Sequence, residues 1–236
     1  MPSAKDIPII VLNLDRDIER LEHVKGQLSA LSLPFQRFAA TDKLTLTEAD
    51  RKQYSPKLAL LNCTRELSDG EIACSLSHIR IWQDIVENNY TLTLILEDDV
   101  ILMPEIKEVL LALQSRSSDY DLINFNTTAK QTTFGDKISN NHQLTTFKGS
   151  ANMTSAYLLT LEGAKMLLKK AFPVRMPADA LTGRTHVTGI KAYGVFPEVA
   201  AIAGFESSIW KGDTVPRKRR FYKKLKKLLK VFFIKL

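Results

Sequence analysis

The sequence predicts an α/β fold, a mostly parallel sheet flanked by helices in one layered domain over residues 1–212. Apolar runs such as residues 7–14 and 91–96 are typical of strands that are buried on both faces. They alternate with segments of helical periodicity, which favours a parallel sheet. The composition, 44% hydrophobic and 25% charged, is that of an ordinary soluble domain. It excludes a disordered chain, a collagen-like chain and a bundle of membrane spans.

The expected elements follow in chain order. We expect strands over residues 7–14, 35–40, 91–96, 121–126, 156–160, 192–196 and 198–203. We expect a first helix that begins after Asp15 or Asp17, either of which can cap it, and that ends at Pro34. Further helices are expected over residues 71–88, 104–114 and 161–171. Residues 177–190 favour a further helix or loop. Residues 41–69 are predicted as loop with a short helix near 48–53, and residues 127–149 as a hairpin or a mobile loop.

Three consecutive carboxylates, Glu97, Asp98 and Asp99, end the strong central strand. In open parallel sheets, ligands bind beyond the carboxyl ends of the strands. Strand alternation turns Glu97 and Asp99 to one side and Asp98 to the other. Such a cluster needs a compensating cation or a ring of donors, and a hard divalent ion shared with a diphosphate explains it economically. The alternative is that the three residues cap the helix beginning at Pro104 and solvate a turn.

The turn after the first strand, residues 13–20, carries no glycine-rich fingerprint, so the dinucleotide and P-loop interpretations fail there. A helix N-terminus still favours anions. Arg16 and Arg20 lie one turn apart and can face one phosphate or carboxylate. The alternative is a surface pair interleaved with Asp17 and Glu19.

The segment GEIACSLSH, residues 70–78, begins a helix that Ser68 or Asp69 can cap. Cys74 and His78 are four residues apart and can meet, which raises the idea of a thiol nucleophile. A buried helical cysteine is usually inert, which weighs against a thiol nucleophile. We expect His78 instead to act as a hydrogen-bonding residue behind the acidic cluster.

The cysteine count is low. Cys63 and Cys74 give neither a disulfide framework nor a zinc-binding spacing, and both are expected to be free thiols. The N-terminal apolar run is too short for a secretory signal, and no stretch of about 18 apolar residues is present. The sequence therefore predicts a cytoplasmic body.

Taken together, these segments resemble glycosyltransferase family 25, which includes lipopolysaccharide and lipooligosaccharide galactosyltransferases and collagen galactosyltransferases. The resemblance spans roughly residues 7 to 210, and the combination of GE-x-x-C-x-x-SH with EDD is its specific part. The segments that carry it are NLDRDIER, Ala40-Thr41-Asp42, GEIACSLSH followed by IW, LILEDDV, Ser155-Ala156-Tyr157-Leu158-Leu159, Gly163-Ala164-Lys165, Pro177-Ala178-Asp179 and Pro197.

The resemblance implies an inverting enzyme that uses a nucleotide sugar and has a GT-A-like, Rossmann-related fold. It implies that Asp99 and Glu97 bind Mn²⁺ or Mg²⁺. The residues expected to bind the nucleotide sugar are Asn13, Arg16, Arg20, Asp42, Glu97 and Asp98. Those expected to give structural support are Glu71, Cys74, Ser77 and His78.

Inversion requires a general base for the acceptor hydroxyl, and Asp179, in the family-like Pro-x-Asp position, is the first candidate. Glu206, Asp98 and Asp213 are rivals. The alternative for Asp179 is a helix N-cap. The family often has two acidic residues after this proline, whereas Ala180 follows Asp179 here.

The expected reaction is transfer of a sugar, galactose from UDP-galactose in the first place, to a lipooligosaccharide or lipopolysaccharide acceptor. UDP-N-acetylglucosamine and UDP-glucose are the alternative donors. A catalytically silent, membrane-binding scaffold is the alternative of a different class, and intact Glu97, Asp98 and Asp99 weigh against it.

The net charge of +7 comes from the end of the chain. From Arg217 to Leu236 there are ten basic and no acidic residues, which leaves 23 basic and 26 acidic residues elsewhere, a net of −3. Residues 213–236 are predicted to form a basic amphipathic helix that lies on the anionic inner face of the cytoplasmic membrane. The alternatives are packing on the body or on a partner subunit, and nucleic-acid binding, which the acidic body opposes.

Overall fold

The computed structural model describes residues 7–205. The predicted tail helix, the boundary after residue 212 and two rival bases, Glu206 and Asp213, lie outside the described residues. The described strands are β1 Ile9–Asn13, β2 Gln36–Ala39, β3 Leu92–Glu97, β4 Val100–Leu102, β5 Leu122–Asn124, β6 Gln131–Lys137, β7 Gln143–Phe147, β8 Ala156–Thr160, β9 Ala192–Phe196 and β10 Ala200–Ile202. The described helices are α1 Ile18–Ala30, η2 Lys43–Thr45, α2 Glu48–Lys52, α3 Pro56–Cys63, α4 Asp69–Glu87, α5 Ile106–Gln114, α6 Leu161–Ala171, α7 Ala178–Gly183 and α8 Thr185–Thr188.

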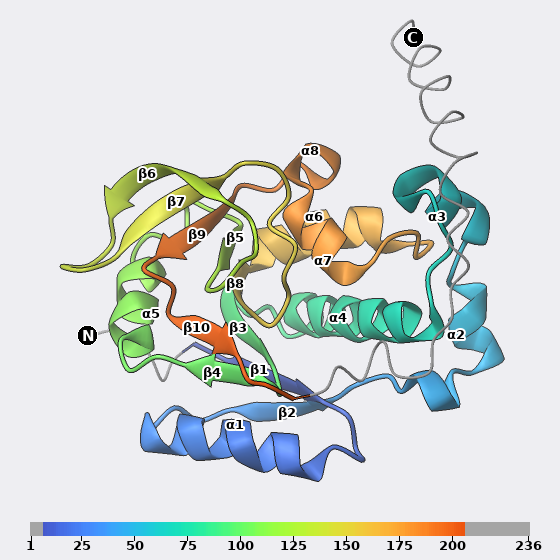
Figure 1. Ribbon diagram of the computed structural model, residues 1–236, viewed down its shortest axis with the longest axis horizontal. Helices are drawn as coiled ribbons and strands as arrows, with labels where there is room; N and C mark the ends of the chain where they lie inside the picture. Colours follow the sequence, from blue (N-terminus) through green and yellow to red (C-terminus); the bar gives the residue numbers. More distant parts are fainter. Residues whose placement is uncertain (1–6, 206–236) are drawn as a thin grey trace, which may run out of the picture.

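The central sheet has eight strands in the order β2-β1-β3-β8-β5-β9-β7-β6, and β4 pairs with β10 in a separate small sheet (Figure 1). The pairs β1–β2, β1–β3 and β5–β9 are parallel, whereas β8 is antiparallel to both β3 and β5. The pairs β7–β9 and β6–β7 are also antiparallel. Six strands therefore run in one direction and only β8 and β7 run against them, which confirms the predicted α/β class with a mostly parallel sheet.

Hydrophobic side chains cover both faces of this sheet. One core cluster joins the sheet to α1 and α5, through residues such as Val24 and Leu110. The other joins it to α4, α6 and α7, and Figure 1 shows α4 running along that side. Along β3, Leu94 and Leu96 belong to the first cluster and Ile95 to the second. This alternation turns Glu97, two residues after Ile95, toward α4.

Three elements were not predicted, namely η2, α3 and β4. The segment expected to be loop contains α3, which has Ser55 as its N-cap and Pro56 in its first turn; Tyr54 forms an isolated parallel bridge with Val174 beside it. The acidic residues are followed by the three-residue strand β4 rather than by a helix. The interpretation that they cap the following helix is therefore wrong, since α5 begins only at Ile106.

The remaining predicted elements are present. The hairpin expected within residues 127–149 is the pair β6–β7. Among residues 7–205, no helix combines the length and the apolar character needed to cross a bilayer.

Candidate active site

The N-terminus of α4 is fixed by a buried carboxylate. Ser68 is its N-cap, and Ser68 and Glu71 form a reciprocal capping box, with the Glu71 amide 3.2 Å from Ser68 Oγ and the Ser68 amide 3.0 Å from Glu71 Oε2. Arg65 donates to both oxygens of Glu71, one at 2.6 Å. Because this anchors the helix that carries Cys74 and His78, the geometry fits the structural role expected for Glu71.

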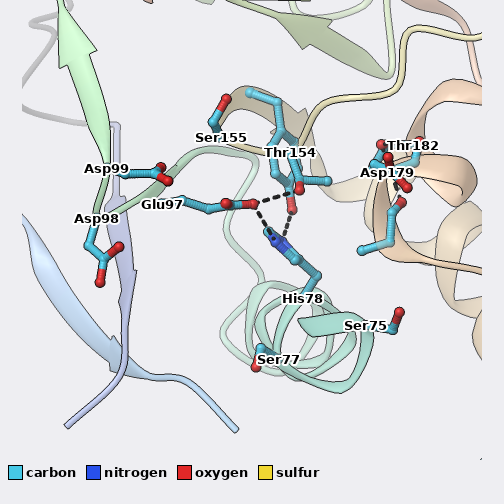
Figure 2. A network of polar contacts seen from close by, with 12 residues as sticks. Ser75, Ser77, His78, Glu97, Asp98, Asp99, Thr154, Ser155, Asp179 and Thr182 are labelled. Carbon is cyan, nitrogen blue, oxygen red and sulfur yellow. Dashed lines mark hydrogen bonds and ion pairs between the residues drawn. The ribbon is translucent and has the colours of Figure 1, made fainter. Parts of the chain in front are cut away.

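His78 brings α4 into contact with the end of β3. Its ring is fully buried, and Nε2 lies 3.2 Å from Glu97 Oε1 while Nδ1 lies 2.9 Å from Tyr157 Oη. Thr154 Oγ1 donates to the same Glu97 oxygen at 2.6 Å (Figure 2). Glu97 is therefore held from α4 on one side and from the segment before β8 on the other.

Asp98 and Asp99 are held by residues of the first turn and of α1. Asn13 Nδ2 donates to Asp98 Oδ2 at 2.7 Å. Arg20 Nη2 lies 2.5 Å from Asp98 Oδ1 and 3.0 Å from Asp99 Oδ2. Figure 2 shows Asp98 turned away from the side to which Glu97 and Asp99 point, as the strand alternation predicts.

The three carboxyl groups differ in acidity because their surroundings differ. Burial together with the negative charge of Glu97 raises the pKa of Asp99 to about 6, against the opposing effect of Arg20. Burial also raises the pKa of Asp98, although the Asn13 amide and Arg20 oppose it. For Glu97, burial acts in the same direction, but the hydrogen bonds from His78 and Thr154 prevail and lower its pKa.

The acidic cluster fits a hard divalent cation. Asp99 Oδ1 is buried, and within the described part of the chain it has no hydrogen-bond partner. A buried carboxylate oxygen without a donor is costly, and a cation would satisfy it while favouring the ionised form of Asp99. Glu97 and Asp99 supply the oxygen ligands that Mg²⁺ and Mn²⁺ prefer.

Two cavities meet at this cluster. The first, of about 150 Å³, lies between the turn after β1, the start of α1 and α4. Its walls include Asn13, Arg16, Arg20, Thr41 and Ser77, together with the three acidic residues. Ser77 Oγ accepts from the Thr41 amide at 2.8 Å, which ties the segment after β2 to α4.

The two arginines of the first cavity pair with different carboxylates. Arg16 forms an ion pair with Asp42, whereas Arg20 binds Asp98 and Asp99. Both guanidinium groups nevertheless line the first cavity, so the expectation that they face one phosphate or carboxylate stays a prediction. Asp42 itself also accepts from the Leu44 amide at 2.9 Å and caps η2.

The second cavity, of about 500 Å³, lies on the other side of Glu97 and Asp99. Asp179 and Arg184, from the α7–α8 region, line it, as do Arg65 and the segment before β8. Burial raises the pKa of Asp179. Glu97, Asp99 and Cys74 are common to the two cavities, so they form the boundary between them.

The segment before β8 is held close to α7. A Cβ at Gly183 would lie 2.5 Å from the Ala151 carbonyl oxygen, so only glycine permits this approach. Ser155 Oγ lies 2.8 Å from Asn126 Nδ2 and 2.9 Å from Asn126 Oδ1. This hydrogen-bonded pair, which we call the Asn126–Ser155 clasp, joins the two ends of the segment that contains β6 and β7.

Neither cysteine forms a disulfide bond, as predicted. Burial raises the pKa of the Cys74 thiol well above its ordinary value, and the charge of Glu97 acts in the same direction. A protonated thiol is a poor nucleophile, which argues against covalent chemistry at Cys74.

Several contributors to the site were not predicted. Thr154, Tyr157 and Arg65 were not singled out as site residues, yet they bind Glu97, His78 and Glu71, respectively. Tyr157 lies within a segment quoted for the resemblance, which was the only available signal. For Thr154 and Arg65 the sequence gives no periodic or motif signal.

Residues 6–182 match the family model described as glycosyltransferase family 25 (LPS biosynthesis protein). The chain belongs to glycosyltransferase family 25. A "Glycosyltransferase 25 family member" from Anopheles gambiae is 32% identical over 171 residues, which are 69% of this chain and 28% of that protein. A Haemophilus influenzae relative is 31% identical over 181 residues, 72% of this chain and 61% of that protein.

Human "Procollagen galactosyltransferase 2" is 26% identical over 180 residues, 72% of this chain and 29% of that protein. This family-25 chain thus spans less than two thirds of the length of each of these relatives. A solved glycosyltransferase involved in the glycosylation of the major capsid of PBCV-1 covers 69% of this chain and 65% of its own, with 14% identity and a TM-score of 0.35. That likeness is too low to carry an argument.

Proposed function

We propose that this family-25 chain is an inverting glycosyltransferase that moves galactose from UDP-galactose to a lipooligosaccharide or lipopolysaccharide acceptor. The observation that carries the proposal is the meeting of two cavities at Glu97 and Asp99. In an inverting transfer the acceptor hydroxyl attacks the anomeric carbon of the donor sugar on the side opposite the departing diphosphate. Two adjoining cavities provide one for the donor and one for the acceptor. Galactose is the favoured sugar because human procollagen galactosyltransferase 2 is among the relatives.

The first cavity takes the nucleotide sugar in this proposal. Asn13, Arg16, Arg20 and Asp42 surround the start of α1, where a helix N-terminus favours an anionic diphosphate. Glu97 and Asp99 would hold Mn²⁺ or Mg²⁺, which supplies positive charge to the departing diphosphate. Asp98 also lines this cavity and contributes to binding of the nucleotide sugar in this proposal, and Asn13 and Arg20 hold its carboxylate in place.

The second cavity takes the acceptor. Asp179 accepts the proton of the attacking hydroxyl, and its raised pKa makes it a stronger base than an exposed aspartate. Because the hydroxyl attacks on the side opposite the departing diphosphate, the configuration at the anomeric carbon is inverted, as in glycoside hydrolysis with two separated carboxylates. His78 and Thr154 fix the Glu97 oxygen that separates the two cavities.

Isothermal titration with UDP in the presence and absence of Mn²⁺ tests the donor site. We expect UDP binding that requires Mn²⁺ and is lost in Asp99→Ala. Asp119→Ala is the matched control, because Asp119 pairs with Arg116 on the surface and lines neither cavity. Absent UDP binding, or binding that Asp99→Ala leaves unchanged, contradicts the proposal and favours a silent scaffold.

The donor sugar is tested by nucleotide release. UDP-galactose, UDP-N-acetylglucosamine and UDP-glucose are compared with a truncated lipooligosaccharide as acceptor. We expect the highest turnover with UDP-galactose. Higher turnover with either of the other two donors would contradict galactose as the transferred sugar but would still agree with a glycosyltransferase.

The basic tail is proposed to place the enzyme on the inner face of the cytoplasmic membrane. From Arg217 to Leu236 the sequence has ten basic residues among apolar ones, and each basic residue near an anionic surface contributes about 1 kcal/mol. In flotation with anionic vesicles we expect the full chain to bind and a chain ending at Val215 to remain unbound. Equal flotation of both chains contradicts this placement.

A further inference from the structure

A cluster of sulfur, nitrogen and oxygen ligands lies beside the proposed cation site. One ligand atom each from Cys74, His78 and Glu97 lies within 4.8 Å of the other two. Cys74 and His78 are one turn apart on α4, and Glu97 ends β3 on the face that α4 covers. Such a mixed set is typical of borderline cations such as Zn²⁺ and Co²⁺, whereas Mg²⁺ selects oxygen ligands alone.

The cluster can be reached from either cavity. Cys74 and Glu97 line both cavities, while His78 lies buried behind them. A cation held by three protein ligands at about 2.0–2.3 Å keeps one coordination position open toward the cavity. The three carboxylates of residues 97–99 make the surroundings attractive to cations, with Arg20 as the opposing charge.

The neighbours of His78 suit a metal-bound imidazole. A histidine that binds a metal through one ring nitrogen usually donates the other N–H to an oxygen, which fixes the ring. Here Nε2 faces Glu97, and Nδ1 lies 2.9 Å from Tyr157 Oη. Tyr157 Oη is itself fixed by the indole N–H of Trp82 at 2.9 Å, and a phenol oxygen can accept both donors.

We propose that Cys74, His78 and Glu97 bind one thiophilic divalent cation, Zn²⁺ in the first instance, and that the Cys74 thiol releases its proton to solvent through the adjoining cavity as the cation binds. This cation excludes Mn²⁺ or Mg²⁺ from Glu97 and thereby inhibits sugar transfer. The binding stands on the cluster geometry alone, whereas the inhibition rests on the proposed function.

Titration of the full chain with Co²⁺ tests the binding, because cysteine-bound Co²⁺ absorbs in the near ultraviolet through thiolate-to-metal charge transfer. We expect this band to saturate at one equivalent of Co²⁺ and to disappear on addition of Zn²⁺. Cys74→Ser should abolish the band and Cys63→Ser should keep it, a matched pair because these are the two cysteines of the chain. Tyr157→Phe should weaken Co²⁺ binding about 10–100-fold while leaving the band in place at saturation.

A wild-type chain without the band, or a band of equal strength in Cys74→Ser, overturns the binding. In the transfer assay we expect Zn²⁺ to inhibit competitively with Mn²⁺, and Cys74→Ser to need at least about tenfold more Zn²⁺ for half inhibition. Active enzyme that gives no Co²⁺ band refutes this inference alone. A Co²⁺ band in a chain that transfers no sugar from any UDP donor supports the metal site and refutes the proposed function.

Discussion

Thr154 Oγ1 lies 2.6 Å from Glu97 Oε1, and the two residues are 57 positions apart in the chain. This bond links the segment before β8 to the end of β3 at the boundary between the two cavities. It is also one of the interactions that lower the pKa of Glu97. The segment that lines the second cavity thus stabilises a carboxylate proposed to bind the cation.

Replacing Thr154 by valine removes this donor with little change in volume. Because a hydrogen bond to a charged group contributes about 1.5–3 kcal/mol, we expect Mn²⁺-dependent UDP binding to weaken about tenfold or more in titration calorimetry. Thr185→Val is the control, since Thr185 is exposed on α8. Equal affinities for Thr154→Val and wild type would show that Thr154 does not support the cation site.

Asp179→Asn should abolish sugar transfer and leave UDP binding unchanged. The amide cannot accept the hydroxyl proton, and Asp179 lines the second cavity, proposed for the acceptor, and not the first, proposed for the nucleotide. We expect a fall in turnover of about 10²–10⁴-fold, measured with saturating donor. If turnover falls by less than about tenfold, Asp98 or one of the two acidic residues beyond residue 205 becomes the candidate base.

Gly183→Ala should destabilise the chain by about 1–3 kcal/mol. Its new Cβ would lie 2.5 Å from the Ala151 carbonyl oxygen and 3.0 Å from Asn152 Oδ1, and the backbone must move to relieve the overlap. Gly26→Ala is the matched control. Gly26 lies in the interior of α1 with no atom within 4 Å of a built Cβ, so alanine should stabilise by about 0.5–1 kcal/mol. Urea unfolding of the two variants should therefore shift in opposite directions.

Tyr157→Phe should cost more stability than Tyr120→Phe. Both phenols are buried, but Tyr157 Oη lies within hydrogen-bond distance of Trp82 Nε1 and His78 Nδ1, whereas within residues 7–205 Tyr120 Oη donates to the Leu113 carbonyl alone. A buried polar group left without a partner costs about 1–3 kcal/mol. Chemical unfolding at neutral pH measures both losses, and a larger loss for Tyr120→Phe would contradict this assignment.

The stability contributed by Asp50 should disappear in acid. The Thr47 hydroxyl and the Arg80 guanidinium hold the pKa of Asp50 below its ordinary value, although burial opposes them. The contribution is therefore present above the unfolded-state pKa of about 3.9 and is lost as the pH falls through the lower, folded-state pKa. We expect the difference in unfolding free energy between wild type and Asp50→Asn to shrink between pH 6 and pH 3. The exposed pair Asp136–Arg116 gives a control variant, Asp136→Asn, with an effect below about 1 kcal/mol.

The predictable part of the site is the part encoded by short-range patterns. Glu97, Asp98 and Asp99 follow directly from a buried strand, and the alternation of β3 sets which of them faces α4. Likewise, the Ser68–Glu71 box lies within four consecutive residues and begins α4 as expected.

The remaining contacts depend on long-range packing. Arg20 and Asp98 are 78 positions apart, and no local signal shows that this guanidinium compensates the acidic cluster. The strand β4 exists only because β10, about 100 residues later, pairs with it. Thr154 reaches Glu97 only because β8 is inserted between β3 and β5.

The Asn126–Ser155 clasp has a consequence for how the sequence between its two residues can change in evolution. Asn126 follows β5 and Ser155 precedes β8, so the two side chains hold together the ends of a segment that contains β6 and β7. Doubling the length of a closed loop costs only about 0.6 kcal/mol. The connection between β6 and β7 can therefore lengthen at little cost in stability, while Thr154 and its neighbours before β8 keep their place in the wall of the second cavity.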